Sequence, residues 1–479
     1  MKEYDVIAIG TGSAMNIISS LTSPHNHEQQ LKIAVIDKDD PGGICLTKGC
    51  IPTKILLYPS EVIRTIQRAS LFGIDVDIKK IDFKFVMERM RSIINSDIES
   101  IRAGLSQAQE LDYYPETAEF IDDYTLKVGK DTIKGKTILL CTGSKPKIPD
   151  IKGLEDVSYH TSDSILQISK LPETITIVGG GYIAAEYGHF FSTMGSKVTI
   201  IGRNSQFLPQ EEPEISALAK RDLQKHMEIY TDFEVIEVGK DGKKKKTIAT
   251  NRTTNEKITI ESDEIFIATG RSSNSDILHP EKSGIKTDSK GWILVNEYME
   301  TSKLGIWAFG DANGKFLFKH AANYESQVAF YNAFQKQEMI AEYHAIPHAV
   351  FTDPEVAGVG LGEKQAIEQF GEDEILIGFH RYQDTAKGHA MELEDYFVKI
   401  IVNRETSEIL GAHIIGPFAS VLIQEVINLM YTPDRSVIPL MRGMHIHPAL
   451  NEVVERAAGR LIPVNQYHEF LKHLGYAEK

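Results

Sequence analysis

The chain has 479 residues, 42% of them hydrophobic and 25% charged, and a formal net charge of -15. The length predicts more than one hydrophobic core, and the composition predicts a soluble globular protein without a membrane span. The negative charge argues against a nucleic-acid partner, because phosphate binding needs a basic surface. The one basic run, Lys240 to Lys246, is expected to be a solvated hairpin turn. The first residues show no secretory signal pattern, which favours a cytoplasmic location.

The first predicted unit is YDVIAIGTGSAMNIIS, an apolar strand followed by a glycine turn and a helix. Gly10 and Gly12 form the turn, and the next apolar strand ends in Asp37. This order places a pyrophosphate over a helix N-terminus, and an acidic residue after the second strand can bind ribose hydroxyls. The unit therefore predicts a site for the adenosine part of a flavin or of NAD. Met15 replaces the third glycine of the motif, so looser helix packing is expected there.

The next feature is GGICLTKGCIPTK, residues 42–54, which contains two of only three cysteines in the chain. Cys45 and Cys50 are about one and a half helical turns apart, so a local helix distortion can bring the sulfurs into bonding distance. Such a pair can cycle between dithiol and disulfide. A zinc site would need two further ligands nearby, so no metal is predicted. Two buried thiols without a function are the remaining alternative.

A second strand, glycine turn and helix follows in TITIVGGGYIAAEYGHFFSTMGSKVTIIGRN. Gly179 and Gly181 form its turn, and its second strand ends in Gly202 and Arg203. No carboxylate is available there for a ribose 2′-hydroxyl, whereas a guanidinium can bind a 2′-phosphate. NADPH is therefore favoured, with NAD(H) still possible. The alternative is that both units are tight turns of an ordinary α/β protein.

From Ile346 onward, alternating strands and helices predict an added α+β domain. Near its end, His447 and Glu452 can form an imidazole and carboxylate pair for proton transfer, although a structural histidine is the alternative. A flavin between a nicotinamide and a disulfide would join these features, because hydride transfer must be converted into thiol exchange.

The motifs GGICLTKGCIPTK, ATGR, FGDANG and HIHPALNEVVE, with the two glycine units, occur in the order typical of the flavoprotein disulfide oxidoreductase family. The chain resembles this family from Tyr4 to about Leu461, and within it looks most like mycothione reductases and dihydrolipoamide dehydrogenases. The resemblance implies a glutathione reductase-like α/β fold with two doubly wound dinucleotide-binding domains and a C-terminal α+β dimerisation domain. The expected boundaries are 1–148 and 267–345 for FAD binding, 149–266 for NAD(P) binding, 346–465 for the interface domain and 466–479 for a tail.

The resemblance also implies residue roles. Cys50 would be the flavin-proximal thiol that forms the charge-transfer thiolate, and Cys45 the interchange thiol that attacks the substrate. Lys54 and Glu186 would pair near the flavin N5, while His447 and Glu452 would reach the site from the second subunit of a homodimer. The cofactor-binding residues would be Gly10, Gly12, Asp37, Gly43, Thr142, Gly143, Gly179, Gly181, Arg203, Gly270, Gly310 and Asp311. Cys141 matches no redox position of the family.

The predicted function is FAD-dependent transfer of electrons from NAD(P)H through the Cys45 and Cys50 disulfide to a small disulfide. NAD-dependent oxidation of dihydrolipoyl groups is the first alternative, and Gly202 counts against it because those enzymes usually carry a carboxylate at this strand end. A redox-sensing flavoprotein without turnover is the second alternative, and the retained acid-base pair counts against it. The extra cysteine pairs of mercuric and high-molecular-weight thioredoxin reductases are absent from the sequence.

Overall fold

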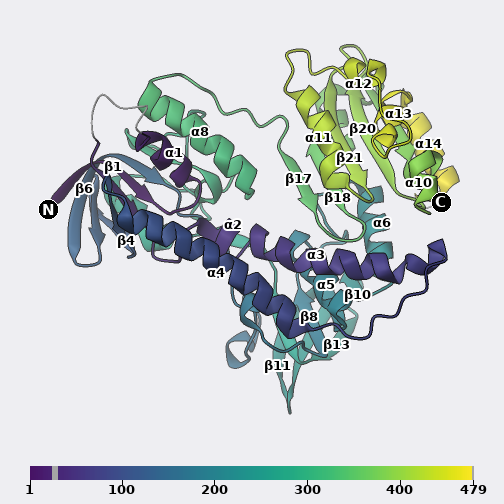
Figure 1. Ribbon diagram of the computed structural model, residues 1–479, viewed down its shortest axis with the longest axis horizontal. Coiled ribbons are helices and arrows are strands. Elements are labelled where there is room, and N and C mark those ends of the chain that lie inside the picture. The colour runs from purple at the N-terminus through teal and green to yellow at the C-terminus, as the bar shows by residue number, and fades with distance from the viewer. Residues whose placement is uncertain (24–30, 477–479) are drawn as a thin grey trace.

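The computed structural model describes residues 1–23 and 31–476, and its first part is built on a seven-stranded sheet (Figure 1). The strand order is β3-β2-β1-β6-β5-β4, with β16 paired to β6. β1 and β2 are buried along most of their length, as expected for parallel strands covered on both faces. The strands are β1 (Lys2–Ile9), β2 (Ile33–Ile36), β3 (Leu111–Tyr114), β4 (Ala118–Asp122), β5 (Thr125–Val128), β6 (Asp131–Leu140) and β16 (Ile306–Ala308).

Five helices accompany this first part: α1 (Ala14–Leu21), α2 (Gly43–Thr47), α3 (Cys50–Gln67), α4 (Phe83–Gln107) and α8 (Lys319–Gln335). α1 and α8 pack against each other although they are far apart in the sequence. α4 buries Met87, Met90, Ile94 and Ile98, a spacing of three and four residues that places them on one helix face. This long helix extends from the first sheet toward the second, as Figure 1 shows.

The second part repeats the strand, turn and helix plan in a parallel four-stranded sheet of order β10-β9-β8-β14. A three-stranded antiparallel sheet, β11-β12-β13, is attached to it. The Lys240 to Lys246 run forms the β11–β12 hairpin, but it is only partly solvated, because Lys245 is buried and binds Glu264. The elements are β8 (Thr174–Val178), α5 (Tyr182–Met194), β9 (Lys197–Gly202), α6 (Pro213–Leu223), β10 (Glu228–Thr231), β11 (Phe233–Asp241), β12 (Lys244–Asn251), β13 (Lys257–Ser262) and β14 (Glu264–Ile267).

The third part is a six-stranded antiparallel sheet of order β17-β18-β21-β20-β19-β22. β20 and β21 are buried at every position. The strands are β17 (Pro347–Val350), β18 (Val356–Gly360), β19 (Ile375–Arg381), β20 (Phe397–Asn403), β21 (Ile409–Ile415) and β22 (Leu461–Pro463). The helices are α9 (Glu363–Phe370), α10 (Ala386–Ala390), α11 (Ala419–Met430), α12 (Ile438–Arg442), α13 (Glu452–Ala458) and α14 (Val464–Leu474).

A buried lysine links the second and third parts. The Lys399 side chain, on β20, is 1% exposed, and its Nζ lies 2.5 Å from Glu212, 2.6 Å from Glu214 and 2.8 Å from Glu363. These carboxylates precede or belong to α6 and α9, so one ammonium joins three elements. Two short pieces, β7 (Ser144–Pro146) paired with β15 (Arg271–Ser273) and followed by α7 (Ser275–Leu278), connect the first two parts.

The architecture confirms the predicted α/β fold with two dinucleotide-binding units and a C-terminal α+β part. Among the described residues, none of the helices combines the length and the apolar character needed to cross a membrane.

Candidate active site

A cavity of about 1500 Å³ is lined by residues from all three parts of the fold. It exceeds the roughly 300–1,000 Å³ of a typical small-molecule site. Sixteen of the eighteen residues predicted for the site line this cavity, and the two that do not are His447 and Glu452. The structure therefore brings both glycine turns and the cysteine pair to one space.

The first glycine turn closes tightly against β6. Gly10 has φ +103°, and a Cβ at this position would lie 2.0 Å from the carbonyl oxygen of Cys141, so only glycine fits. Asp37, after β2, accepts hydrogen bonds at Oδ2 from the Thr11 backbone N–H at 2.8 Å and from Thr11 Oγ1 at 2.5 Å. Burial raises the pKa of Asp37. Met15 is half-buried and packs against the core around α1.

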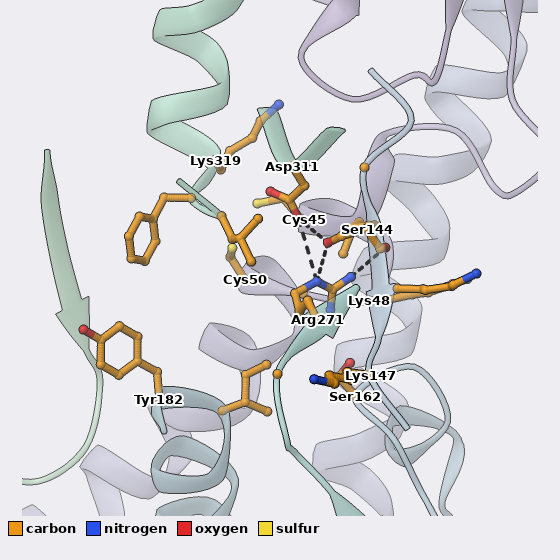
Figure 2. A pocket seen from close by; sticks show the side chains of 18 of the residues that line it. Cys45, Lys48, Cys50, Ser144, Lys147, Ser162, Tyr182, Arg271, Asp311 and Lys319 are labelled. Atoms are coloured by element: carbon orange, nitrogen blue, oxygen red, sulfur yellow. Dashed lines mark hydrogen bonds and ion pairs between the residues drawn. The ribbon is translucent and has the colours of Figure 1, made fainter. Parts of the chain in front are cut away.

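The cysteine pair lies at a break between two helices. Cys45 belongs to α2 and Cys50 begins α3, and a Cβ on Gly49 would lie 2.9 Å from the carbonyl oxygen of Ile44 and 3.3 Å from Cys45 Cα. A glycine between the helices thus allows the chain to fold back. Both cysteines are free thiols and face the cavity (Figure 2).

The two thiols differ in acidity. A hydrogen bond from Cys45 lowers the pKa of Cys50 to about 7, with help from the charge of Lys54, although burial opposes the change. The same hydrogen bond, together with burial, raises the pKa of Cys45. Cys50 is therefore the thiolate of the pair near neutral pH.

Lys54 and Glu186 form a charge pair next to Cys50. Lys54 Nζ lies 2.7 Å from Oε1 and 2.8 Å from Oε2 of Glu186. The backbone N–H of Phe351 donates to Glu186 Oε1 at 3.2 Å, and Lys54 Nζ lies 4.3 Å from the centroid of the Phe351 ring. Lys54 is four residues after Cys50 on α3, so both project from one face of the helix.

A second acidic residue is held by a guanidinium that the sequence prediction missed. Ser144 Oγ donates a hydrogen bond to Asp311, while Arg271 Nη2 donates to the Ser144 carbonyl at 2.8 Å and Arg271 Nε lies 3.7 Å from Asp311 Oδ2 (Figure 2). Burial raises the pKa of Asp311. Gly310 donates its N–H to buried Glu325 at 2.6 Å, which fixes the turn. Arg271 is the arginine that ends the ATGR motif, and this motif is the feature of the sequence that could have identified it.

The second glycine turn repeats the geometry of the first. Gly179 has φ +134°, and a Cβ there would lie 2.2 Å from the carbonyl oxygen of Ala268. A Cβ on Gly181 would have no atom within 4 Å, so this residue faces open space. At the end of β9, a Cβ on Gly202 would lie 3.2 Å from Gly180 Cα, which crowds any larger side chain.

Two arginines meet at the end of β9, where the side chain of Arg252 binds the backbone of Arg203. Arg203 is exposed and lines the cavity. Arg252 Nη1 donates to the carbonyl oxygen of Arg203 at 3.2 Å and lies on the loop after β12, 49 positions away. Arg252 was not predictable from the sequence, because no local pattern links it to the end of β9.

The imidazole and carboxylate pair is formed, but away from the cavity lining. His447 Nδ1 lies 2.9 Å from Glu452 Oε1, which also accepts from Arg456 Nη2 at 3.1 Å, while the Ala449 N–H donates to Oε2 at 3.2 Å. The hydrogen bond with His447 is the main cause that lowers the pKa of Glu452. Since an ionised carboxylate only accepts, Nδ1 carries a hydrogen and Nε2 is left for proton exchange. The His447 side chain is 66% exposed.

Two further observations concern the cavity wall. Cys141 lies beneath the first glycine turn, and burial raises its pKa to about 11, which leaves it protonated at neutral pH. Tyr182, directly after the second turn, stacks on His348 with ring centroids 5.7 Å apart, and His348 Nε2 lies 2.9 Å from buried Glu211. From the sequence, Cys141 was assigned no redox role, and the contacts of Tyr182, His348 and Glu211 were not predicted.

Comparisons with known proteins agree along most of the chain. The family model of pyridine nucleotide-disulphide oxidoreductases matches residues 4–329, and the model of their dimerisation domain matches residues 346–458. A mycothione reductase from Mycobacterium tuberculosis is 36% identical over 95% of this chain and 99% of its own. A dihydrolipoyl dehydrogenase from Synechocystis sp. is 31% identical over 96% of this chain and 99% of its own. The solved Cu(II) complex of the HOCl-induced flavoprotein disulfide reductase RclA from Escherichia coli superposes with a TM-score of 0.84 over 96% of this chain and 99% of its own at 24% identity, a likeness of fold.

Proposed function

Because the chain belongs to the pyridine nucleotide-disulphide oxidoreductase family, we propose that it reduces a small, low-molecular-weight disulfide with NADPH through bound FAD and the Cys45 and Cys50 pair. The observation that carries this proposal is the shared cavity, which unites two glycine turns with a dithiol in which Cys50 ionises near neutral pH. Without the second glycine turn, the dithiol would have no site nearby for the nicotinamide that supplies its electrons. Two turns without the dithiol would have no thiol product.

The cavity residues fit the cofactors of the family. The glycine positions Gly181 and Gly270 are open on the side where a Cβ would point, which leaves room for a ligand close to the backbone. Asp37 and Asp311 both line the cavity, and each would accept hydrogen bonds from hydroxyl groups of FAD. Bound FAD would supply the relay between a two-electron hydride donor and a disulfide.

Residues of this chain would carry out the thiol–disulfide exchange, in which electrons and protons balance. With the pair as a dithiol, His447 would accept the proton of Cys45, whose sulfur then attacks one sulfur of the substrate disulfide; that S–S bond breaks, and the first substrate thiol leaves with the proton returned by His447. The Cys50 thiolate then attacks Cys45, releases the second substrate thiol and forms the internal disulfide. Two electrons from NADPH restore the dithiol, so one NADPH and one proton convert one disulfide into two thiols. Lys54 and Glu186 would flank the position where these electrons arrive.

His447 would protonate the leaving thiols from the partner subunit of a homodimer. Its exposed side chain lies on a loop that also exposes Met444 and Ile446, by 102% and 76%, within the part that matches the dimerisation domain. Apolar side chains at this exposure are typical of a surface that a second copy covers. Glu452 would keep the imidazole in the tautomer whose Nε2 faces the substrate.

NADPH is proposed over NADH because of the β9 end. The strand β9 ends in Gly202 and Arg203, without an acidic residue for a 2′-hydroxyl, and Arg203 lines the cavity there. Arg252 bonds the Arg203 carbonyl, and its Nε also lies 3.8 Å from Glu234 Oε2. The second candidate function is NAD-dependent oxidation of dihydrolipoyl groups, because a dihydrolipoyl dehydrogenase is 31% identical to this chain.

The test is an anaerobic titration of the purified FAD protein with NADPH and, separately, with NADH. Flavin reduction and the long-wavelength thiolate band are recorded, and lipoamide or a panel of small disulfides is then added. Fast reduction by NADPH with reoxidation by a small disulfide supports the proposal. Preference for NADH with lipoamide turnover would replace it with the second candidate, and failure to bind FAD would reject both.

A further inference from the structure

Lys319, the first residue of α8, reaches back to the first glycine turn. Its Nζ donates a hydrogen bond to Ser13 Oγ at 3.0 Å, across 306 positions of sequence. Ser13 directly precedes α1 and is 2% exposed, and its hydroxyl donates onward to Asn323 Oδ1 at 2.9 Å. Two helices that pack together thus hold an ammonium group at the turn. Figure 2 shows Lys319 on the side of the cavity that carries Asp311 and Cys45.

The ammonium has no anionic partner in the part of the chain that the structure describes. No carboxylate of those residues lies within 4.0 Å of its nitrogen. Lys319 is half-buried, and its charge favours the thiolate of both Cys45 and Cys141, where it opposes the rise in pKa that burial causes. A half-buried cation that faces a large cavity is expected to meet a negative group there.

The glycine turn has few free donors for a diphosphate. The N–H of Gly10 donates to Ile36 at 2.8 Å, and that of Thr11 donates to Asp37 at 2.8 Å. The N–H groups of Met15 and Asn16 bond within the first turn of α1, at 3.3 and 3.2 Å. A diphosphate carries two negative charges, and α1 has only eight residues, so the remaining backbone donors leave part of that charge uncompensated.

We propose that Lys319 binds the pyrophosphate of FAD, so that the first dinucleotide site combines a helix N-terminus with a side-chain cation. The proposal rests on the proposed function only through FAD, which is the dinucleotide assigned to this turn. The proposal makes the two glycine turns different in their charged neighbours. The first turn has a lysine beside it, whereas Gly181 of the second turn is open and the arginines near that turn lie at the end of β9. The lysine would act in retaining FAD and not in the thiol exchange.

The test measures FAD affinity of the full-length apoprotein by flavin fluorescence. Lys319→Gln should weaken FAD binding by roughly 10- to 100-fold, because a charge-assisted hydrogen bond is lost. Lys319→Arg should stay within a few-fold of the unaltered protein, since the charge is kept. Lys315→Gln is the matched control: this lysine also lines the cavity, but it is exposed and lies 5.1 Å from the centroid of the Tyr343 ring, so its loss should leave FAD binding unchanged.

Salt dependence gives a second readout from the same two proteins. FAD affinity of the unaltered protein should fall with ionic strength more steeply than that of Lys319→Gln. Equal affinity of Lys319→Gln and the unaltered protein overturns the proposal. Unchanged affinity with a more negative two-electron flavin potential would also overturn it, and would place the ammonium at the flavin ring. An unaltered protein that binds no FAD rejects the proposed function itself, whatever the variants do.

Discussion

Replacing Cys45 by alanine tests the cause of the acidity of Cys50. The hydrogen bond from Cys45 is the largest cause that moves the pKa of Cys50 from its ordinary 9.0 to about 7. At pH 7 a thiol with a pKa of 7 is half ionised, whereas one with a pKa of 9 is about 1% ionised, so complete loss of the change would lower the thiolate fraction roughly 50-fold. Cys45→Ala removes the donor, while Cys45→Ser keeps a hydroxyl that can still donate.

The assay is the rate of iodoacetamide alkylation of Cys50 as a function of pH in the FAD-loaded variants, with absorbance of the thiolate as a second readout. Cys141 does not interfere below about pH 9, because burial raises its pKa to about 11. The lowered pKa means that the thiolate is present above pH 7 and is lost as the pH falls through 7. The rate should therefore rise near pH 7 in Cys45→Ser and at clearly higher pH in Cys45→Ala.

If both variants titrate near pH 7, the hydrogen bond is not the cause and the reasoning is wrong. The charge of Lys54 would then be the main stabilising group, and Lys54→Met in the Cys45→Ala background would move the titration instead.

Three further predictions concern other parts of the molecule. His447→Gln should lower disulfide turnover by about 10²- to 10⁴-fold while flavin reduction by NADPH stays unchanged, and unaltered turnover would reject the assigned acid. Arg203→Ala and Arg252→Ala should each raise KM for NADPH by about 10-fold or more but leave KM for NADH unchanged; equal effects on both cofactors would contradict 2′-phosphate binding. Lys399→Met should lower the free energy of unfolding by about 3–5 kcal/mol, because two buried carboxylates and a half-buried one lose their cation, whereas exposed Lys364→Met should change it by less than about 0.5 kcal/mol in the same denaturant titration.

The parts of the site that depend on local backbone geometry were predictable from the sequence. Gly10 and Gly179 are required by positive φ angles and by carbonyl oxygens about 2 Å from any Cβ, and strand and helix patterns on either side reveal such turns. The His447 and Glu452 contact is also local, since five positions separate the two residues at the start of α13. The sequence therefore predicted both turns and this pair.

Contacts between distant segments were not predictable in this way. Arg271 meets Ser144 across 127 positions, and Lys319 meets Ser13 across 306. Each depends on how two elements pack after the chain has folded, and no local spacing encodes that packing. His447 does not line the cavity of its own chain. Its position relative to the cysteines would depend on how the two subunits of the proposed homodimer pack.

The two glycine turns share one backbone geometry, but the side chains around them differ in a way that matches two kinds of ligand. At the first turn, Asp37 is bonded to Thr11, and Lys319 is bonded to Ser13, so side chains close around the site. At the second turn, Gly181 is open and Arg203 is exposed. A prosthetic flavin must stay bound through many turnovers, whereas a nicotinamide must enter and leave in each one. With FAD at the first turn and NADPH at the second, as proposed, a closed first site and an open second site would meet these opposite requirements with the same strand, turn and helix unit.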